Sequence, residues 1–180
     1  FSSAEIERLA ADRTPLSDIM SLSLSRPLSE RFQLTLDAFA TRLAETPTSG
    51  GVAATPELPL ETTIQAQLIG ASLWRSSDLF VLSARWQDGE VQQVASVGLA
   101  TRLPLGSAWR IGPRLRVDRR ESTIDAAVET LYVPALRIDY QRGATWFEFE
   151  GGAELGTRVI PAEDEKSTRY YFSLGYRINF

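Results

Sequence analysis

Charged side chains recur at alternate positions in the second half of the chain, and they are the residues with the clearest chemical potential. Four successive segments carry them: Arg110, Arg114 and Arg116; Arg137 and Asp139; Glu148, Glu150 and Glu154; Arg169 and Arg177. In a β-strand, residues two apart point to the same face. Opposite charges on neighbouring strands are then close enough to pair. The spacing therefore predicts a ladder of arginine–carboxylate pairs on one face of a sheet.

The sequence leaves two uses of this ladder open. It can keep charges paired and fix the register of the strands, or it can line a pore, where rings of charged side chains control which solutes pass. Catalysis is a weaker alternative. Glu148 and Glu150 could serve as the paired carboxylates of a glycosidase, but both lie on one strand. Neighbouring arginines also favour ionised carboxylates over the protonated acid that this chemistry needs. We therefore expect no enzyme.

The composition removes most other catalytic and metal chemistry. The chain of 180 residues contains neither cysteine nor histidine, which excludes thiolate nucleophiles and Ser-His-Asp triads. We expect no metal and no cofactor. Only Lys166 among the 19 basic residues is a lysine, and the net charge is −4. Because the arginines are scattered along strands rather than clustered, nucleic acid is not an expected partner.

No apolar run reaches the roughly 18 residues of a membrane-spanning helix, a test that says nothing against membrane-crossing strands. The chain lacks an initiator Met, and no basic and apolar leader stands at its amino end. We expect that a signal peptide has been removed or that these residues are the tail of a longer protein.

Two regions follow from the periodicity. Residues 1–14 are expected to form a short capped helix in an extracellular loop, because Ser2 and Glu5 have capping-box spacing and Phe1 and Ile6 fit the accompanying hydrophobic staple. Pro15 then ends the helical pattern. Residues 15–180 are expected to form the strands of an outer-membrane β-barrel.

Nine segments of this second region alternate between apolar and polar residues. They run from Met20 to Ser25, Phe32 to Thr41, Thr62 to Trp74, Phe80 to Gln87, Ala95 to Leu103, Trp109 to Asp118, Pro134 to Gln141, Phe147 to Leu155 and Arg169 to Phe180. Phe39 breaks the alternation of the second segment, and Leu68, Ile69 and Leu73 blur the third. Repeated strands with one apolar and one polar face are typical of an all-β, antiparallel up-and-down transmembrane barrel.

The connections between these segments predict two different rims. Long links are expected at Ala44–Glu61, Arg120–Thr130 and Thr157–Ser167, together with a tight turn at Asp88-Gly89. Only tight turns are expected on the opposite rim, at residues 28–31, 75–78, 105–107 and 141–144. Bacterial barrels have long extracellular loops and short periplasmic turns, so the long links predict the extracellular side.

Nine is an odd number, whereas bacterial barrels have an even number of strands and both ends in the periplasm. An open sheet would also leave two unpaired edges in lipid, at a cost of several kcal/mol for each unsatisfied peptide group. We therefore expect these strands to be the carboxyl-terminal part of a larger barrel. A complete eight-stranded barrel is the alternative if one segment is miscounted.

Aromatic residues cluster towards the expected strand ends, which is the position of an interfacial belt. They are Trp74, Trp86, Trp109, Tyr132, Tyr140, Trp146 and Tyr176. Trp146 and Tyr171 share the parity of the charged residues instead of the apolar ones. Those two rings are the candidates for stacking on sugar rings inside a barrel.

The last eight residues carry a recognisable pattern. Ser173, Gly175, Ile178 and Phe180 occupy the polar, glycine, apolar and terminal aromatic positions of the signal by which the bacterial barrel-assembly machinery recognises its substrates. This segment resembles that signal at every defined position. The resemblance implies an outer-membrane location in a Gram-negative bacterium and the assembly machinery as a partner.

Longer stretches resemble the carboxyl-terminal barrel of large outer-membrane proteins that carry periplasmic tetratricopeptide repeats, among them polysaccharide-exporting porins. The stretches are residues 28–33, 47–53 and 109–116 and the final Gly175-Tyr176-Arg177. The helical repeats themselves are not in this sequence. The resemblance implies contact with outer-membrane lipid and lipopolysaccharide, and polysaccharide as a candidate cargo.

Three hypotheses follow. The first is a barrel segment that forms a pore or channel wall for transport or secretion. The second is a structural membrane anchor for a periplasmic repeat domain. The third, from a different class, is a soluble β-sandwich or lipocalin-like binding domain, because alternation by itself establishes only that a strand is half-buried.

Overall fold

The computed structural model describes residues 2–160 and 163–178. The chain opens with helix α1 (Ser3–Arg13), which begins at the predicted cap, where the Glu5 backbone N–H donates to Ser2 Oγ at 3.3 Å. Phe1 lies outside the described residues, so the predicted staple stays a prediction. None of the described helical residues form a segment long and apolar enough to span a membrane.

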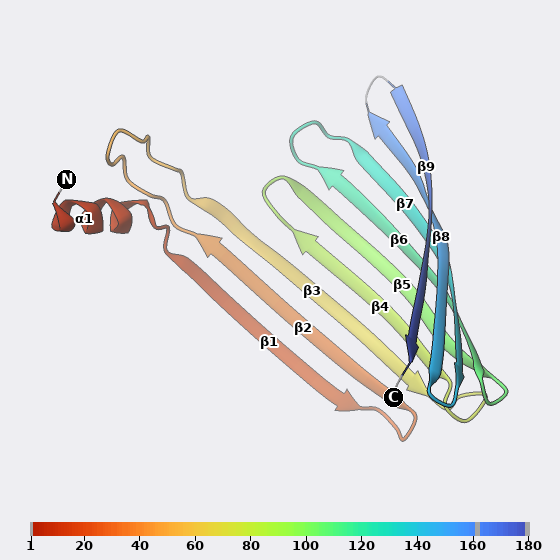
Figure 1. The fold of residues 1–180 in the computed structure, drawn as a ribbon. Helices are drawn as coiled ribbons and strands as arrows, with labels where there is room; N and C mark the ends of the chain where they lie inside the picture. The colour runs from red at the N-terminus through yellow and green to blue at the C-terminus, as the bar shows by residue number, and fades with distance from the viewer. Residues whose placement is uncertain (1, 161–162, 179–180) are drawn as a thin grey trace.

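Nine strands follow α1, and each contains most of one predicted alternating segment. They are β1 (Ser17–Pro27), β2 (Phe32–Leu43), β3 (Leu58–Ala71), β4 (Leu79–Asp88), β5 (Gln92–Leu105), β6 (Trp109–Ser122), β7 (Val128–Arg142), β8 (Thr145–Ile160) and β9 (Glu163–Ile178). They form one sheet in sequence order, and every neighbouring pair is antiparallel (Figure 1). The all-β, up-and-down part of the prediction is confirmed.

The register places the apolar parity of every strand on the same face. One cross-strand row shows this: Leu24, Leu36, Ala66, Ala84, Val97, Val117, Tyr132, Leu155 and Thr168 are successive partners from β1 to β9. A slip of one residue in any pair would have exchanged the two faces of that strand. Phe39, the residue that broke the alternation, lies on the polar face opposite Ser21.

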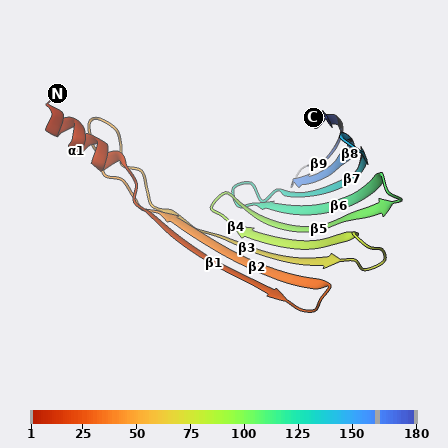
Figure 2. The ribbon, with the colours of Figure 1, turned by 60° about the horizontal axis from the view of Figure 1, so that its bottom comes forward.

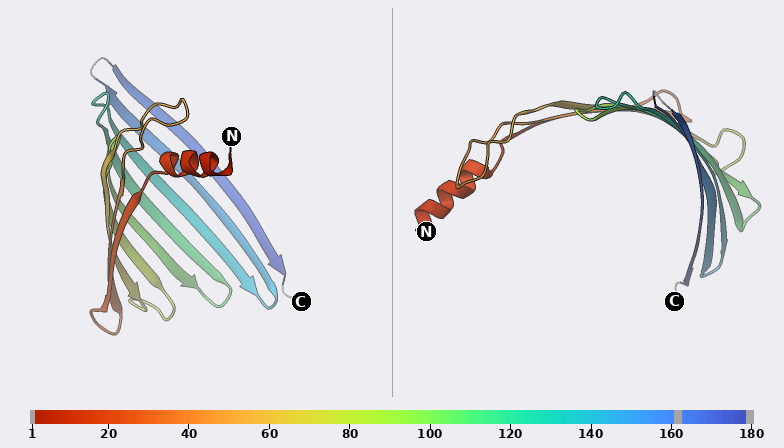
Figure 3. Two further views of the ribbon diagram at one scale, coloured as in Figure 1. Left: turned by 90° about the vertical axis from the view of Figure 1, so that its left-hand side faces the viewer. Right: turned by 90° about the horizontal axis from the view of Figure 1, so that it is seen from above.

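The sheet curves along its width into an open arc, with β1 and β9 at its two ends (Figures 2 and 3). Its polar face is the concave one. Asp118 and Asp139 on this face are only 4% and 3% exposed, whereas Leu99 and Leu115 on the apolar face are 39% and 45% exposed. Among the described residues, Ala127 is the sole buried hydrophobic residue. The molecule therefore buries charge and exposes apolar surface.

The arc is not closed. β1 pairs only with β2 and β9 only with β8 among the described strands, so each leaves one edge unpaired. The nine strands form a single layer, whereas the β-sandwich of the third hypothesis would need two. The sequence predicts that these strands are part of a larger closed barrel, and the nine described strands do not close by themselves.

Two predicted long links are wrong. β8 and β9 pair continuously through most of the region predicted as the link Thr157–Ser167, as the pairs Thr157 with Lys166 and Arg158 with Glu165 show. β6 and β7 likewise leave only residues 123–127 between them instead of Arg120–Thr130. Polar residues outnumber apolar ones on both faces of these stretches, although Val128 and Val159 are partners on the convex face, so the alternation is lost while the backbone ladder continues.

The rims are correspondingly less distinct than predicted. Links 44–57, 89–91 and 123–127 share one rim, which we call the loop rim. Links 28–31, 72–78, 106–108 and 143–144 share the other, the turn rim. Link 72–78 is longer than the tight turn predicted there, because β3 ends at Ala71 and Leu73 and Trp74 lie in the link. Among the links that the structure describes, only link 44–57 remains a long loop on the loop rim.

Helix α1 docks on link 44–57, beside the loop rim (Figure 1). Arg13 Nη2 donates to the carbonyl oxygens of Ser49 (3.2 Å) and Gly50 (3.1 Å), and the Ser49 hydroxyl donates to Asp12 at 2.8 Å. Gly50 has φ +56°, and a Cβ there would lie 2.8 Å from Leu9 Cδ2. Glycine at this position therefore permits both the left-handed turn and the close approach of the helix.

Candidate functional site: the charged concave face

The strand register gathers the predicted charge ladder on the concave face. Arg110, Asp139, Glu148 and Gly175 form one cross-strand row, and Gly112, Arg137, Glu150 and Ser173 form the next. Arg114 and Arg116 follow on β6, Glu154 and Arg169 are partners on β8 and β9, and Arg177 faces Trp146. The ladder thus occupies one continuous area of β6 to β9.

Ion pairs connect these side chains across the strands. Arg137 reaches Asp139 (Nε to Oδ1, 3.0 Å) on its own strand and Glu148 (Nη2 to Oε2, 2.9 Å) on β8. Arg114 pairs with Glu150, and Arg169 lies 3.6 Å from Glu154. The Arg169–Glu154 pair is largely exposed, so solvent screens it more than the others. Arg137 lies at the centre of the least exposed part of the charge ladder, because it pairs with both Asp139 and Glu148.

Two of the pairs pass over an intervening strand. Arg102 on β5 reaches Asp139 on β7 at 3.5 Å, across β6 and close to Gly112. Arg114 on β6 reaches Glu150 on β8 across β7. Such contacts need a concave surface, because side chains on a concave surface converge. They also need small residues on the intervening strand, beneath the paired side chains. A Cβ on Gly112 would lie 3.0 Å from the Thr101 carbonyl oxygen.

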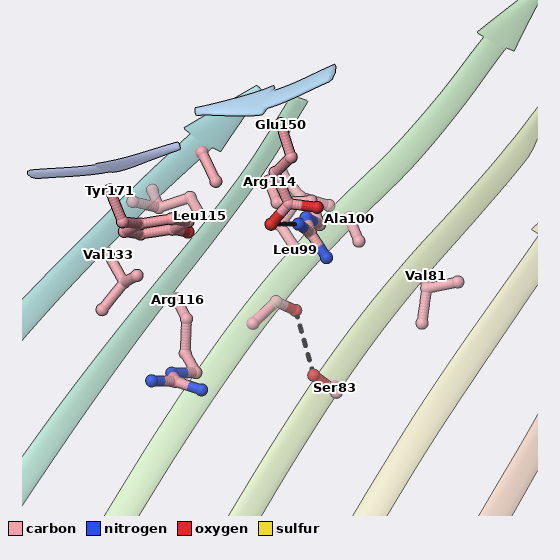
Figure 4. A pocket seen from close by; sticks show the side chains of 12 residues that line it. Val81, Ser83, Leu99, Ala100, Arg114, Leu115, Arg116, Val133, Glu150 and Tyr171 are labelled. Carbon is pink, nitrogen blue, oxygen red and sulfur yellow. Dashed lines mark hydrogen bonds and ion pairs between the residues drawn. The ribbon is translucent and has the colours of Figure 1, made fainter. Parts of the chain in front are cut away.

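A shallow hollow lies beside the Arg114–Glu150 pair (Figure 4). It measures about 270 Å³, and its lining includes the small residues Ser83, Gly98, Ala100 and Ala135 together with apolar residues such as Val81 and Val133. The Ser83 hydroxyl donates to the Gly98 carbonyl oxygen at 3.4 Å. Tyr171 on β9 lines the same hollow, with Gly152 next to its ring: a Cβ there would lie 2.6 Å from Tyr171 Oη.

A second hollow, of about 440 Å³, continues the first towards the loop rim. Its lining is mostly polar, with Gln65, Arg85, Gln87, Arg116 and Asp118 among its residues. Asp118 accepts from Arg116 Nε at 3.1 Å, and Arg120 Nη2 lies 3.9 Å away. Its Oδ1 atom has no hydrogen-bond partner among the described residues.

The two rings proposed for sugar stacking lie on the concave face but differ in surroundings. The Arg177 guanidinium lies over the Trp146 ring, 5.5 Å from its centroid, so one face of that ring already has a cationic partner. Tyr171 borders the first hollow. Near Trp146, Arg110 Nη1 donates to Gln141 Oε1 at 3.2 Å.

Aromatic residues also form a row on the convex face near the turn rim. Trp109, Tyr140, Phe147 and Tyr176 are successive partners on β6 to β9. Ring centroids lie 4.7 Å apart for Trp109 and Tyr140, and 6.4 Å apart for Tyr140 and Phe147. Trp74, in link 72–78, is 69% exposed on the same rim. Trp86 and Tyr132 lie nearer the loop rim.

Two carboxylates, those of Asp78 and Asp125, accept backbone hydrogen bonds within the links between strands. Burial alone raises the pKa of Asp78, but backbone N–H groups of Arg75, Trp74 and Leu73 donate to its carboxylate at 2.7–2.8 Å and bring the pKa below its ordinary value. In link 123–127, the Ser122 hydroxyl and the Ala127 N–H lower the pKa of Asp125, and Arg158 of β8 pairs with it at 2.9 Å.

Several members of the charged face were not among the predicted residues. Arg102 and Asp118 had the right parity within predicted strands, and that parity was the signal that could have identified them. Arg120 pairs with Glu129 at 3.4 Å, but both lay in a stretch predicted as a loop. Within the described ranges, no group of three acidic residues is placed to hold a metal ion.

The predicted assembly signal is described only in part. Ser173, Gly175 and Ile178 lie in β9, with Ser173 and Gly175 on the concave face. Phe180 and Asn179 lie outside the described residues. Comparisons of the chain with protein-family models, with curated proteins and with solved structures find no match.

Proposed function

We propose that these nine strands form part of the wall of a β-barrel pore in the outer membrane of a Gram-negative bacterium. The observation that carries the proposal is the inverted distribution of polarity. Large apolar side chains cover the convex face, while carboxylates such as Asp139 are buried on the concave face. A monomer in water gains stability by the opposite arrangement. A wall between lipid and an aqueous lumen needs this one.

The height of the apolar band on the convex face matches the thickness of the hydrocarbon core of a bilayer. On β6 the convex face is apolar from Trp109 to Val117, and the next convex residues, Arg119 and Glu121, form an ion pair at 2.8 Å. On β7 the corresponding span runs from Tyr140 to Tyr132. Each span covers about nine residues, the length of a tilted strand that crosses the hydrocarbon core. The aromatic row of Trp109 and Tyr140 lies where an interfacial girdle is expected.

The stagger of the strands also supports a barrel. The cross-strand row that starts at Pro27, the last residue of β1, ends at Tyr171, well before the described end of β9. Each strand is therefore displaced along its neighbour by slightly under one residue. With about 3.3 Å per residue and about 4.8 Å between strands, the tilt is roughly 30°. Closed barrels typically tilt by about 35–45°.

Conductance tests the pore directly. The complete polypeptide that contains this chain, reconstituted in planar bilayers, should conduct ions, and replacing Arg114 and Arg116 by Glu should shift its selectivity towards cations. Arg119→Glu on the convex face of the same strand is the matched control and should leave selectivity unchanged. A folded barrel that does not conduct, even after any plug is removed, would contradict the pore.

A structural anchor is the second candidate, and the density of ion pairs favours it. Arg137, Asp139 and Glu148 satisfy one another, as expected of a lumen whose charges fix the strands. In this case, deleting link 44–57 and neutralising the concave charges should leave the biological function intact.

If the pore carries polysaccharide, as the sequence resemblance implies, Tyr171 in the first hollow is the ring available to stack on it, and Tyr171→Ala should slow export.

A further inference from the structure

We infer that the concave face of β4 to β6 binds a linear acidic polysaccharide, a chain that carries carboxylates along its length. The inference rests on the proposed function, because it takes the concave face to be the lumen of a pore. It goes further in naming the class of cargo and the side chains that hold it. These side chains, which we call the arginine track, are Arg85, Arg102, Arg110, Arg114, Arg116 and Arg120.

The strand register gathers the arginine track on one face. Most of its members share the concave parity of β6, where residues two apart lie about 6.6 Å from each other along the strand. Arg102 of β5 lies beside Gly112, at the position where β6 has no side chain. Arg85 of β4 lines the second hollow with Arg116 and Arg120. Because β6 begins at the turn rim and ends at the loop rim, the track runs along most of the height of the wall.

The ion pairs of the arginine track place the guanidinium group above and the carboxylate beneath. The Arg116 side chain is 54% exposed, whereas that of its partner Asp118, the single acidic residue at the concave positions of the described strands β4 to β6, is 6% exposed. The Arg102 side chain is 47% exposed and that of its partner Asp139 is 4% exposed. Arg116 uses Nε for its pair, which leaves its two terminal nitrogens to bind a further anion. A water-filled lumen therefore meets guanidinium groups, although each pair is neutral.

Neutral hydrogen-bonding groups around the arginine track indicate a saccharide. The second hollow also contains the amides and hydroxyls of Gln65, Ser83, Gln87, Gln92 and Ser96. Such groups donate and accept hydrogen bonds, as the hydroxyls of a sugar require, while a guanidinium binds a carboxylate with two parallel bonds. The first hollow adjoins the second, because Ser83, Gly98 and Arg116 line both, and it adds the ring of Tyr171. Consecutive sugars of one chain can therefore occupy both hollows.

A nucleic acid fits these hollows less well. Its affinity for a protein groove comes from phosphate contacts and from bases stacked on several aromatic rings. Among the described residues, Tyr171 is the one aromatic residue that lines either hollow. Trp146, on the same face, already has the Arg177 guanidinium over its ring. The hollows therefore offer charge and hydroxyl recognition but little stacking surface.

The carboxylates beneath the arginine track also limit its affinity. A channel has to bind its cargo well enough to admit it and weakly enough to release it. Glu150 meets this need at the first hollow, because its charge offsets that of Arg114. Arg85, by contrast, donates to the neutral Gln87 at 2.7 Å and keeps its full charge for the cargo. Loss of the Glu150 charge should therefore tighten binding, and loss of the Arg85 charge should weaken it.

Equilibrium binding tests the inference and does not depend on conductance. The complete polypeptide that contains this chain is folded in detergent micelles, and fluorescence anisotropy measures its affinity for a labelled linear oligouronate. A neutral oligosaccharide of the same length should bind roughly tenfold more weakly, because it forms no charge-assisted hydrogen bonds with the arginines. The monomeric uronate should also bind more weakly, since a linked chain engages several arginines at once.

Single variants locate the binding on the arginine track. Arg85→Gln and Arg116→Gln should each weaken oligouronate binding by roughly threefold to tenfold, and Glu150→Gln should tighten it by a similar factor. Arg119→Gln, on the convex face of β6, is the matched control and should leave the affinity unchanged. Only variants that keep the heat-modifiable mobility of a folded barrel in gel electrophoresis are scored. Arg85 has no carboxylate partner among the described residues, so Arg85→Gln leaves no buried charge unpaired and remains a test if Arg116→Gln misfolds.

The inference is overturned if the folded protein does not bind the oligouronate, or if the neutral oligosaccharide or the monomer binds as tightly. It is also overturned if Arg85→Gln and Arg116→Gln bind like Arg119→Gln, or if Glu150→Gln weakens binding. An oligonucleotide of equal charge that binds as tightly as the oligouronate would overturn the assignment to a saccharide. A pore that conducts ions without binding the oligouronate would contradict only the inference, and binding without conductance would contradict only the proposed function.

Discussion

Asp139 illustrates how single residues maintain the concave face. It is almost fully buried, and two guanidinium groups, from Arg102 and Arg137, donate to it. Removing a buried partner costs more than the pair itself contributes, because the remaining charges lose their compensation. The exposed Arg169–Glu154 pair at the edge of the same face has no such dependence.

We therefore expect Asp139→Ala to lower the free energy of unfolding by about 2 kcal/mol. The matched change Glu154→Ala should cost no more than about 0.5 kcal/mol, because solvent screens its partner. Urea titration of the protein folded in lipid vesicles, followed by tryptophan fluorescence, measures both. Equal effects of the two substitutions would show that burial of Asp139 contributes nothing to stability.

Gly151 and Gly152 are adjacent in sequence and face opposite sides of the sheet. A Cβ on Gly152 would lie 2.8 Å from the Pro134 carbonyl oxygen and 2.6 Å from Tyr171 Oη. Because one obstacle is backbone, the strand has to shift. A Cβ on Gly151 would lie 3.4 Å from the Phe149 ring and 3.9 Å from the Tyr171 carbonyl oxygen, both ordinary contact distances.

Gly152→Ala should accordingly destabilise the protein by about 1–3 kcal/mol, the usual cost of overpacking. Gly151→Ala should change stability by less than about 0.5 kcal/mol or raise it, since alanine restricts the unfolded chain. The same urea titration compares the two. A neutral Gly152→Ala would mean that Tyr171 and β7 move aside freely.

Among the connecting elements, link 72–78 depends most on one ionised group. The lowered pKa of Asp78 means that its contribution to the folded link is complete above about pH 4 and is lost as the pH falls through the folded-state pKa. Asp78→Asn should imitate the acid form at neutral pH. It should raise amide hydrogen exchange of residues 72–78 on the order of tenfold, because the amide accepts those bonds less strongly.

Hydrogen-exchange mass spectrometry of the peptide that contains Leu73 to Arg75 measures this effect. Asp88→Asn, at the end of β4 on the other rim, is the control and should leave the peptide unchanged. If the two variants exchange alike, the three backbone bonds to Asp78 do not hold the link.

At the same scale, the elements show what the sequence can and cannot predict. The alternation of apolar and polar residues identified all nine strands and their apolar faces, although Phe39 broke it in the second segment and three residues blurred it in the third. It failed in Thr157–Ser167, because polar residues on both faces of a paired hairpin resemble a loop. Parity also placed Arg114 and Glu150 on one face. Their pairing across β7 depends on the curvature of the sheet, and no local pattern encodes it. Arg102 was missed although its parity within a predicted strand could have identified it, and Arg120 was missed because it lay in a stretch predicted as a loop.

For the whole molecule, assembly should depend on the terminal residue more than stability does. If the terminal strand is the assembly signal, deletion of Phe180 or Phe180→Asp should leave the complete polypeptide to be degraded in the periplasm. A charge facing lipid costs up to about 2–4 kcal/mol at mid-bilayer and less near the interface, so defective assembly should dominate.

The measured quantity is the amount of heat-modifiable barrel recovered from outer membranes. Asn179→Ala, next to the critical residue, is the control and should be tolerated, because the alternation of the sequence predicts that Asn179 shares the parity of the polar residues Ser173 and Gly175. Normal recovery of the Phe180 deletion would show that the terminal aromatic residue is not read.

The single-layer construction has a consequence for how this protein tolerates mutation. In a two-layer protein, substitutions at alternate positions meet either a shared core or water. In the proposed barrel they would meet either hydrocarbon or an aqueous channel, so substitutions on both faces would be constrained. A saturation mutagenesis profile should therefore oscillate with a period of two along β4 to β9. Positions on the convex face should not tolerate charged residues. Positions on the concave face should tolerate exchanges between polar residues, but not larger side chains over Gly98, Gly112 and Gly152. Arg116 and Val133 are partners on the concave face, so concave positions are even-numbered in β6 and odd-numbered in β7. The two patterns of tolerance should therefore change from even to odd positions between these strands.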